Sequence, residues 1–372
     1  MKIVIDQNIR GAETTFVRHG ETVYMDGRGI RREHLEDADL LIIRTTTRAD
    51  AELLEGTPVR FVGTTAIGTD HLDIPWLEAN GIRWCNAPGC NADSAAQYTL
   101  AMIWLACQRL EKKLAGLKAG IIGRGNVGSR VQKLLRMLGV ETVANDPPLT
   151  DAGVSGLVSQ AQALDCDIVC LHVPLTREGP YPTLGMIGPD QLEQMPRGAL
   201  LVNTARGNVV DGPALLAGVE SGRIHAALDC WPGEPDLDPR LVQRATVATP
   251  HVAGYSDDGK RNGTWMVYQA FRDWAGLPPA DRQESGQQRL ELDVSRADCP
   301  LTAALEAACF VPRHDAEMRA LAGSDSDTLA TGFDRLRKQY PFRRDFHGWD
   351  VDCPDRASTA LLATLGFAAR VR

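Results

Sequence analysis

Aromatic residues, long apolar runs and excess positive charge are all scarce in this chain. Aromatic side chains account for 6% of the 372 residues, and the net charge is −8. The longest apolar stretch, residues 98–107, is much shorter than the roughly 20 residues of a membrane-spanning helix. An acidic chain is not attracted to nucleic-acid backbones or anionic lipid surfaces. The composition therefore predicts a soluble globular protein with no nucleic-acid partner and no membrane association.

Paired cysteine motifs are also missing. The nine cysteines are an odd number, and none of them lies in a Cys-x-x-Cys arrangement. Cys166 and Cys170 are four residues apart but have no second pair of ligands. The chain starts with the strand-like residues 3–5 rather than with the layout of a signal peptide. We therefore expect reduced thiols, no metal site and a cytoplasmic location.

What the chain does contain is a regular alternation of short apolar runs and helical patterns. Near-continuous apolar runs at residues 3–5, 40–43, 119–122, 167–171 and 199–203 are typical of parallel strands that are buried on both faces. The alternation predicts an α/β protein with two doubly wound, Rossmann-like domains. After a polar linker at residues 280–290, the residue pattern changes to that of a small C-terminal α+β segment.

A glycine-rich motif opens the second series of strands. Residues 123–128 read Gly-Arg-Gly-Asn-Val-Gly, and they follow a strand and begin a helix. Gly123 permits the tight turn, Gly125 lets the backbone approach a pyrophosphate, and Gly128 lets the helix pack on the strand. The backbone N–H groups of Asn126 and Val127 would then point at phosphate from the helix N-terminus.

An acidic residue follows at the spacing that dinucleotide binding requires. Asp146 lies eighteen residues after Gly128, at the end of the next strand. Its carboxylate can accept hydrogen bonds from ribose hydroxyls and would repel a 2′-phosphate. Pro147 and Pro148 follow it, without an adjacent arginine. The sequence therefore predicts NAD rather than NADP as the cofactor.

Three residues downstream have the chemistry of a hydride-transfer site. Arg206 follows a strand and can form a bidentate pair with a carboxylate. His251 is an acid/base group for a hydroxyl proton, and Glu234 can orient the imidazole. We therefore predict that Arg206, Glu234 and His251 are catalytic.

The local motifs around these residues resemble the D-isomer-specific 2-hydroxyacid dehydrogenases. They are Asn-Thr-Ala-Arg-Gly at 203–207, Trp-Pro-Gly-Glu-Pro at 231–235 and Thr-Pro-His-Val-Ala-Gly at 249–254. The resemblance implies that Asp229 and Gly254 lie on the nicotinamide side of the cofactor. It also implies cofactor contact near Val173, where relatives have threonine, so only backbone contact can survive there.

Within that superfamily, the chain is most similar to the erythronate-4-phosphate dehydrogenase family. The segments that carry this resemblance are residues 61–71, 87–92, 146–148, 178–184, 250–260 and 333–340. The resemblance implies oxidation of 4-phospho-D-erythronate by NAD in vitamin B6 biosynthesis. It also implies substrate contacts from Thr45, Ala66 and Tyr255. The family has threonine at the position of Ala66, so a side-chain hydrogen bond is lost and the backbone N–H remains.

The resemblance also implies a domain organisation and an assembly. Residues 1–93 and 257–285 would form the substrate domain, 94–256 the dinucleotide-binding domain, and 286–372 a dimerisation domain. Several apolar positions of the last segment need cover, which favours a homodimer: Leu301, Leu305, Phe310, Leu361, Leu362 and Leu365. We expect removal of this segment to affect assembly before chemistry.

The sequence leaves three points open. The substrate phosphate has four candidate cations: Arg44, Arg48, Lys260 and Arg261. The same chemistry would serve another 2-hydroxy acid, such as 3-phosphoglycerate. An NAD-sensing binding protein on this fold would also be able to retain the three catalytic residues.

Overall fold

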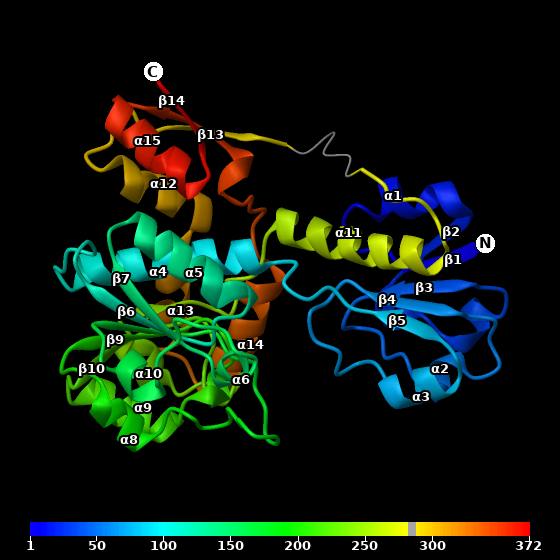
Figure 1. Ribbon diagram of the computed structural model, residues 1–372, viewed down its shortest axis with the longest axis horizontal. Helices are drawn as coiled ribbons and strands as arrows, with labels where there is room; N and C mark the ends of the chain where they lie inside the picture. Colours follow the sequence, from blue (N-terminus) through cyan, green and yellow to red (C-terminus); the bar gives the residue numbers. More distant parts are fainter. Residues whose placement is uncertain (282–287) are drawn as a thin grey trace. The chain divides into compact units, whose positions relative to one another are not determined.

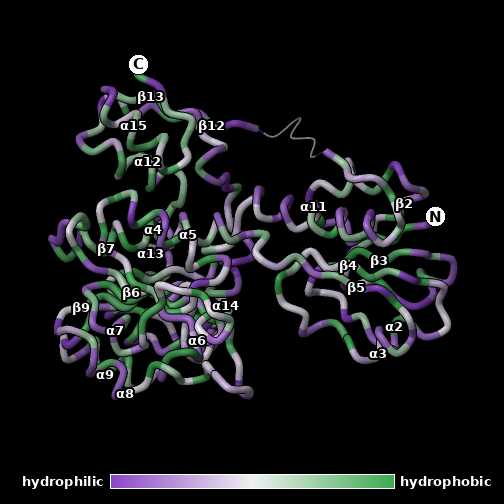
Figure 2. Tube along the Cα trace, in the orientation of Figure 1, coloured by the Kyte–Doolittle hydropathy of each residue, from purple (hydrophilic) through white to green (hydrophobic). Residues whose placement is uncertain are grey.

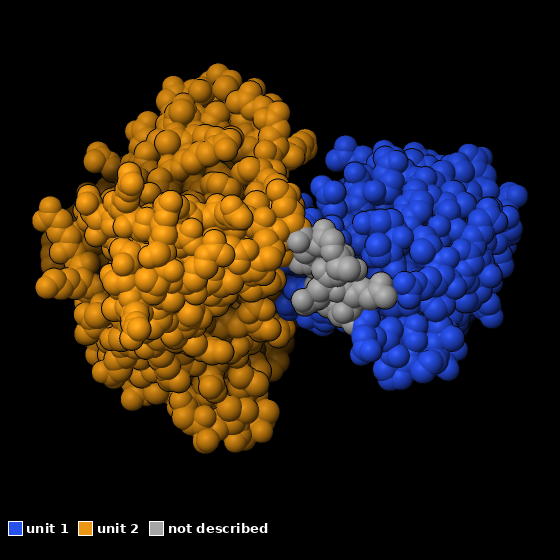
Figure 3. Space-filling view, turned by 90° about the horizontal axis from the view of Figure 1, so that it is seen from above, with its two compact units in different colours: residues 1–91, 256–287 blue, residues 92–255, 288–372 orange. Residues whose placement is uncertain are grey.

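The chain divides into two compact units, coloured separately in Figure 3. One unit contains residues 1–91 and 256–287, and the other contains residues 92–255 and 288–372. The computed structural model describes residues 1–281 and 288–372 (Figure 1). The domain boundary expected at residue 285, and the middle of the expected linker, lie outside the described residues. The C-terminal residues thus share a unit with the nucleotide motif.

The first unit is built on a parallel sheet of five strands in the order β2-β1-β3-β4-β5. The strands are β1 (Lys2–Asp6), β2 (Glu21–Met25), β3 (Leu40–Ile43), β4 (Phe61–Thr64) and β5 (Arg83–Cys85). The α-helices are α1 (Ala12–Thr15), α2 (Ala51–Leu54), α3 (Ile74–Ala79) and α11 (Asp257–Trp274), and short 3-10 turns cover Phe16–His19, Gly27–Gly29 and Arg32–Leu35.

Two apolar layers enclose this sheet. Val4, Leu41 and Val62 face α2 and α3, whereas Ile3, Leu40 and their neighbours face α1 and α11. Figure 1 shows the two helical layers on opposite sides of the strands. Because side chains alternate between faces, a central strand such as β3 carries apolar residues at every position.

The second unit contains a parallel sheet of six strands in the order β11-β10-β9-β8-β6-β7. The strands are β6 (Lys118–Ile122), β7 (Glu141–Asn145), β8 (Ile168–Leu171), β9 (Ala199–Asn203), β10 (Ile224–Leu228) and β11 (Val247–Ala248). The helices are α4 (Ala92–Arg109), α5 (Asn126–Met137), α6 (Pro147–Asp151), α7 (Gln160–Leu164), α8 (Pro189–Gln194), α9 (Gly212–Glu220) and α10 (Pro239–Arg244), with a 3-10 turn at Gly207–Val209.

The strand order of this sheet reverses at β6. The chain moves from β6 outward to β7 on one side and then continues through β8 on the other. Such a switch point leaves a crevice at the carboxyl ends of the strands, where doubly wound folds bind ligands. Helices α4 and α5 cover one face of the sheet (Figure 1), and the colouring of Figure 2 shows apolar residues concentrated on the central strands.

The C-terminal residues form a small layer of helices and strands. Its elements are β12 (Leu290–Asp293), α12 (Pro300–Cys309), α13 (Val311–Leu321), α14 (Ser326–Lys338), β13 (Trp349–Cys353), α15 (Arg356–Leu365) and β14 (Ala368–Val371), with a 3-10 turn at Phe346–Gly348. The three strands are parallel, in the order β12-β13-β14. The fold class predicted from the sequence, two doubly wound domains and a small C-terminal one, is confirmed.

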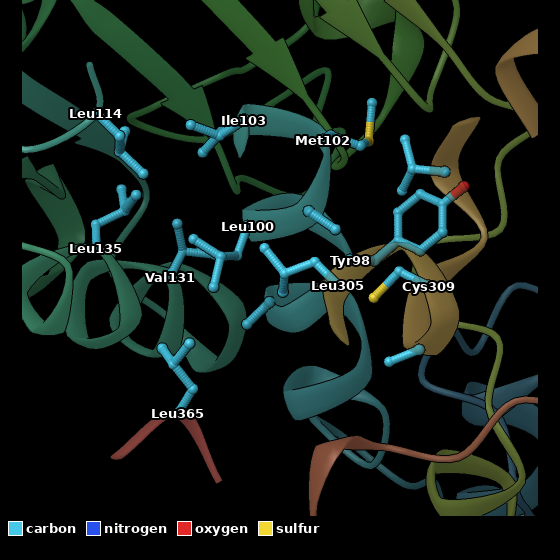
Figure 4. Packing of buried hydrophobic residues seen from close by; sticks show 14 of the residues in the cluster. Tyr98, Leu100, Met102, Ile103, Leu114, Val131, Leu135, Leu305, Cys309 and Leu365 are labelled. Carbon is cyan, nitrogen blue, oxygen red and sulfur yellow. The ribbon is translucent and has the colours of Figure 1, made fainter. Parts of the chain in front are cut away.

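This C-terminal layer shares its hydrophobic core with the nucleotide-binding residues. Leu305 and Leu365 are buried in one cluster with Leu100 of α4 and Val131 of α5. Figure 4 shows these side chains meeting between the helices. Of the six apolar residues expected to need a partner subunit, four are buried within this chain: Leu301, Leu305, Leu362 and Leu365.

Candidate active site

The glycine motif forms a tight loop between β6 and α5. Gly123 has a φ of 89°, and a Cβ atom there would lie 2.7 Å from the carbonyl oxygen of His172. A Cβ atom on Gly128 would lie 2.0 Å from the carbonyl oxygen of Gly123. Neither position accepts a side chain, so the loop packs closely on β6 and on the segment after β8.

The middle glycine faces open space instead. No described atom would lie within 4 Å of a Cβ atom on Gly125, which precedes the first turn of α5. The first helical residues are Asn126 and Val127. An open, side-chain-free approach to the start of a twelve-residue helix fits a pyrophosphate. Val173 packs beside Gly123 through its Cγ1 atom.

Asp146 lies beside this loop at the end of β7. Its carboxylate accepts hydrogen bonds from the backbone N–H of Arg124 at 2.7 Å and from that of Leu149 at 3.1 Å. It therefore fixes the loop and also begins helix α6. An arginine does lie next to Asp146 in space: the side chain of Arg124 donates to Gln132 at 3.0 Å. The sequence prediction did not include Arg124, because this arginine precedes Asp146 by 22 residues in the chain.

The three predicted catalytic residues each follow one of three neighbouring strands at one edge of the sheet. Arg206 comes after β9, Glu234 lies in the loop after β10, and His251 comes after β11. Because β9, β10 and β11 are parallel neighbours, their carboxyl ends meet at the same edge.

Glu234 and His251 form a hydrogen-bonded pair. The Nδ1 atom of His251 lies 2.6 Å from Oε2 of Glu234, and Oε1 of Glu234 accepts the backbone N–H of Trp231 at 2.7 Å. Both carboxylate oxygens are therefore fixed. This arrangement holds the imidazole in one orientation and leaves its Nε2 atom to exchange a proton.

Arg206 is exposed, and its guanidinium donates to the carbonyl oxygen of Ala205 at 2.7 Å. The next residue, Gly207, brings this loop against the loop of Glu234: a Cβ atom at Gly207 would lie 1.7 Å from the carbonyl oxygen of Trp231. The Arg-Gly pair is the sequence signal for this close approach, which the sequence analysis did not use. Asn203 supports the loop by accepting the N–H of Ala205 at 3.1 Å.

Asp229 is fully buried beneath the turn that follows His251. Its carboxylate accepts hydrogen bonds from the Thr249 hydroxyl at 2.6 Å and from the N–H groups of Val252 and Ala253 at 3.0 and 2.9 Å. These bonds hold the turn between His251 and Gly254. The Nε1 atom of Trp231 also donates to the Thr249 carbonyl at 2.8 Å, a contact the sequence analysis did not anticipate.

The expected substrate residues lie in both units. In the first unit, Thr45 follows β3 and Ala66 follows β4, at the same edge of the sheet. Thr45 is exposed, and the N–H of Ala66 donates to the Thr64 hydroxyl at 3.3 Å. In the second unit, Tyr255 ends the turn after His251, and its ring packs edge-on against Tyr340 at 5.5 Å.

Three of the four candidate phosphate cations have carboxylate partners. Arg44 donates to the buried Asp6 at 2.9 and 3.2 Å. Arg48 donates to Asp50 at 2.7 Å, and Arg261 donates to Asp257 at 2.7 Å. For the fourth, Lys260, burial lowers the pKa of the ammonium group.

One group of possible metal ligands occurs among the described residues. Atoms of Cys230, Glu234 and His251 lie within 4.8 Å of one another. The Cys230 thiol donates to the carbonyl oxygen of Ala205, and burial raises its pKa well above the ordinary value. Since a metal-bound cysteine must be a thiolate and Glu234 already pairs with His251, this group fits acid/base chemistry better than metal binding.

Comparisons with known proteins agree with this geometry. Residues 91–253 match the NAD binding domain of D-isomer specific 2-hydroxyacid dehydrogenases, and residues 288–366 match a domain of unknown function. The fold is shared with the NAD+-bound 3-phosphoglycerate dehydrogenase of Entamoeba histolytica, with a TM-score of 0.62 and 23% identity over 77% of this chain and 98% of that one. Fold and site together define an NAD-dependent dehydrogenase of the D-2-hydroxyacid class.

Two full-length relatives narrow the class. The erythronate-4-phosphate dehydrogenase of Marinobacter nauticus is 42% identical over 93% of each chain. That of Teredinibacter turnerae is 41% identical over 99% of each chain. This chain belongs to the erythronate-4-phosphate dehydrogenase family. In the described residues, none of the helices is long and apolar enough to cross a membrane.

Proposed function

We propose that this enzyme oxidises the C2 hydroxyl of 4-phospho-D-erythronate to give 2-oxo-3-hydroxy-4-phosphobutanoate. This step belongs to the biosynthesis of pyridoxal 5′-phosphate. The observation that carries the proposal is the 2.6 Å pair of His251 and Glu234, which lies at the strand edge that also bears Arg206. The names of the relatives and their similarity over the full length support 4-phospho-D-erythronate as the substrate.

The residues divide the reaction between them. Nε2 of His251 accepts the proton of the C2 hydroxyl, and the Glu234 carboxylate stabilises the imidazolium that forms. The guanidinium of Arg206 binds the substrate carboxylate and polarises the C2 oxygen. Bound NAD supplies the acceptor for the hydride that leaves C2. One proton and one hydride thus leave the alcohol, which becomes a ketone.

The cofactor is expected to lie along the second unit. The N–H groups of Asn126 and Val127, beside the open face of Gly125, would hold the pyrophosphate, and Asp146 would accept from the ribose hydroxyls. Gly254 and the backbone of Val173 would complete the contacts. Asp229 would act on the nicotinamide side mainly through the turn that it holds.

The first unit contains a candidate site for a phosphate group. A cavity of about 250 Å³ adjoins Thr46 and Thr47, one residue beyond Thr45, and its lining includes four arginines together with Asp50 and Glu52. The arginines are Arg28, Arg31, Arg32 and Arg48. Arg48 is the only earlier candidate among them. A cluster of guanidinium groups suits a phosphate dianion.

Assembly as a homodimer and a cytoplasmic location complete the proposal. All nine cysteines, each within the described part of the chain, are free, which suits a reducing compartment. The resemblance of residues 286–372 to a dimerisation domain supports the homodimer. Light scattering at micromolar concentration tests it, because a monomeric full-length chain would contradict a stable dimer.

Turnover of 4-phospho-D-erythronate tests the proposed function. The assay would supply NAD together with a 2-oxo acid as a possible acceptor of the reducing equivalents. We expect turnover of this substrate to exceed that of 3-phosphoglycerate and of unphosphorylated 2-hydroxy acids in kcat/KM. Tight NADH binding without turnover of any member of this panel would instead favour a cofactor-sensing protein.

A further inference from the structure

The C-terminal segment contacts the strand and the turn that carry His251. We define the catalytic turn as residues 249–255, which begins directly after β11 and ends at Tyr255. His251 lies in the left-handed region, with a φ of 55°. This conformation is unfavourable for a residue with a Cβ atom, so contacts from outside the turn must hold it.

The entrance to the catalytic turn is held by helix α13. The buried carboxylate of Asp315 accepts the N–H of Ala248, the last residue of β11, at 2.8 Å. Arg319 donates to the carbonyl oxygen of Ala245 at 2.8 Å and also pairs with Asp315. C-terminal side chains therefore bond one N–H of the edge strand β11 and one carbonyl group just before it.

The exit of the catalytic turn is held by a buried arginine. Nη2 of Arg343 donates to the carbonyl oxygens of Ala253 and Ser94, each at 2.9 Å, and the residue is only 2% exposed. The N–H of the same Ala253 donates to Asp229 at 2.9 Å. Residue 253 is thus bonded on one side by a buried carboxylate and on the other by a buried guanidinium.

Aromatic residues near Arg343 connect it to Tyr255, the expected substrate residue at the end of the turn. Its guanidinium carbon lies 5.2 Å from the centre of the Tyr98 ring. The ring of Tyr340, three residues earlier in the chain, packs edge-on against Tyr255 at 5.5 Å. Tyr340 also packs against His314, which bonds the Tyr98 hydroxyl at 2.8 Å.

We propose that Arg343 and Tyr340 are positioning residues for the hydride-transfer reaction, and that the C-terminal segment completes the active site of its own chain. Arg343 sets the backbone between His251 and Tyr255, and Tyr340 sets the ring of Tyr255. The inference rests on the proposed function. It also replaces the expectation that loss of this segment would affect assembly before chemistry.

The first test compares Arg343→Met with Arg343→Lys. Loss of the two carbonyl bonds should lower kcat about 10-fold to 100-fold, the scale expected when a catalytic group is displaced by around 1 Å. NADH affinity should change less than about threefold, because the glycine loop and Asp146 are not touched. Lysine keeps a cation that can reach a carbonyl and should restore part of kcat.

The isotope effect separates positioning from general destabilisation. With substrate deuterated at C2, the effect on kcat should be larger in Arg343→Met than in the wild type, because a displaced His251 makes the chemical step slower than product release. Arg370→Met is the matched control. Arg370 lies in the same segment but pairs at the surface with Asp352 at 2.6 Å, so its replacement should leave kcat and the isotope effect unchanged.

Tyr340→Leu decides the matter if Arg343→Met does not fold. It removes the ring from Tyr255 at a half-buried position and leaves Arg343 in place. We expect KM for the hydroxy acid to rise several-fold with unchanged NADH affinity. Wild-type kcat and KM in Tyr340→Leu would overturn the proposal, and so would wild-type kcat in a folded Arg343→Met.

A measurement that needs no substrate tests the positioning role of Arg343 and Tyr340 separately from the proposed dehydrogenase activity. The rate at which diethyl pyrocarbonate modifies His251, followed by peptide mass spectrometry, reports how firmly the imidazole is held. It should increase in Arg343→Met and Tyr340→Leu but not in Arg370→Met. If the wild type turns over no hydroxy acid, the proposed function fails while this rate still tests the positioning. An unchanged modification rate in both variants would contradict the positioning itself.

Discussion

His251 combines a proposed chemical role with an unfavourable backbone conformation. A non-glycine residue in the left-handed region costs on the order of 1 kcal/mol. The turn that holds it donates two N–H groups to the carboxylate of Asp229 and accepts a hydrogen bond from the guanidinium of Arg343. Such strain is maintained only where surrounding contacts determine the conformation. Here the conformation accompanies the hydrogen bond between the imidazole and Glu234.

Replacement of His251 by asparagine tests the proton transfer. We expect kcat to fall by roughly 10²-fold to 10⁴-fold, because the acceptor for the C2 hydroxyl proton is lost. The affinity for NADH, measured by fluorescence titration, should hardly change. His34→Asn, at a residue on a 3-10 turn of the first unit, is a suitable control. A variant within a few-fold of wild-type kcat would remove His251 from the mechanism.

Asp146 is expected to set the preference for NAD. In Asp146→Ala, binding of NAD should weaken and discrimination against NADP should relax, because the hydroxyl acceptor and the negative charge disappear together. Arg124, whose N–H bonds this carboxylate, could then approach a 2′-phosphate. Parallel titrations with NADH and NADPH measure the effect, with Asp190→Ala as control. An unchanged ratio of the two affinities would refute this role.

At the residue scale, short local motifs predicted more of the candidate site than isolated residues did. The order of Arg206, Glu234 and His251 indicated the chemistry because each lies in a recognisable short motif. Arg343 gave no such signal, and the motif that contains Trp231 did not reveal the contact of its side chain with Thr249. The carboxylate partner of Arg44 is distant in the sequence, because Asp6 lies 38 residues away. Asp50 and Asp257 are local partners of Arg48 and Arg261, and the sequence prediction did not consider them.

At the scale of elements, the β6–α5 connection assigns a different task to each glycine. Gly128 permits helix and strand to touch, whereas Gly125 leaves space that no described protein atom occupies. A matched pair of alanine substitutions can therefore separate folding from cofactor binding within one loop.

In Gly125→Ala, we expect unfolding temperature to stay within a few degrees of the wild type while NADH affinity falls at least about tenfold, because the methyl group meets the pyrophosphate. In Gly128→Ala, the clash at 2.0 Å should lower the unfolding temperature itself. Gly29→Ala, also in open space, serves as control. Thermal unfolding and NADH titration give both readouts. Full NADH affinity in Gly125→Ala would place the pyrophosphate elsewhere.

Strands that are buried on both faces were predictable, whereas three partly exposed edge strands, β2, β12 and β14, were not. The runs at β1, β3 and β9 are apolar throughout because helices cover both faces. Strand β2 was missed because it mixes polar and apolar residues, all of them exposed or half-buried at the sheet edge. Strands β12 and β14 were missed for the same reason.

At the scale of the whole molecule, two buried histidines make stability depend on pH. Burial lowers the pKa of His172 and of His314 to about 3. Both stay neutral in the folded state while the unfolded chain takes up protons below about pH 6.5. Stability is therefore complete above that pH and should fall by about 1.4 kcal/mol for each pH unit per histidine as the pH decreases toward 3.

The variant His314→Gln should flatten this decline. Glutamine can accept from the Tyr98 hydroxyl but binds no proton, so one of the two contributions disappears. Urea unfolding between about pH 7 and pH 5 measures the slope, and His34→Gln is the control. An identical slope in wild type and His314→Gln would show that this site does not govern the pH dependence.

Removal of residues 288–372 should damage the second unit as a whole. The deletion exposes Leu100, Val131 and the other residues that share a core with Leu305 and Leu365. We expect the truncated chain to lose cooperative unfolding and NADH binding together, whereas removal of Val371 and Arg372 alone, both exposed, should have little effect. Calorimetry and NADH titration measure these outcomes. A truncated chain that binds NADH normally would contradict the shared core.

Neither compact unit is continuous along the chain, and this matters while the protein is being synthesised. The first unit lacks α11, with its buried Val267 and Phe271, until the ribosome has passed residue 274. The second unit waits for residues near the C-terminus. This protein therefore cannot fold vectorially, with one domain completed before synthesis of the next begins. Nascent chains must carry two unfinished sheets at once, so we expect a long dependence on chaperones during translation.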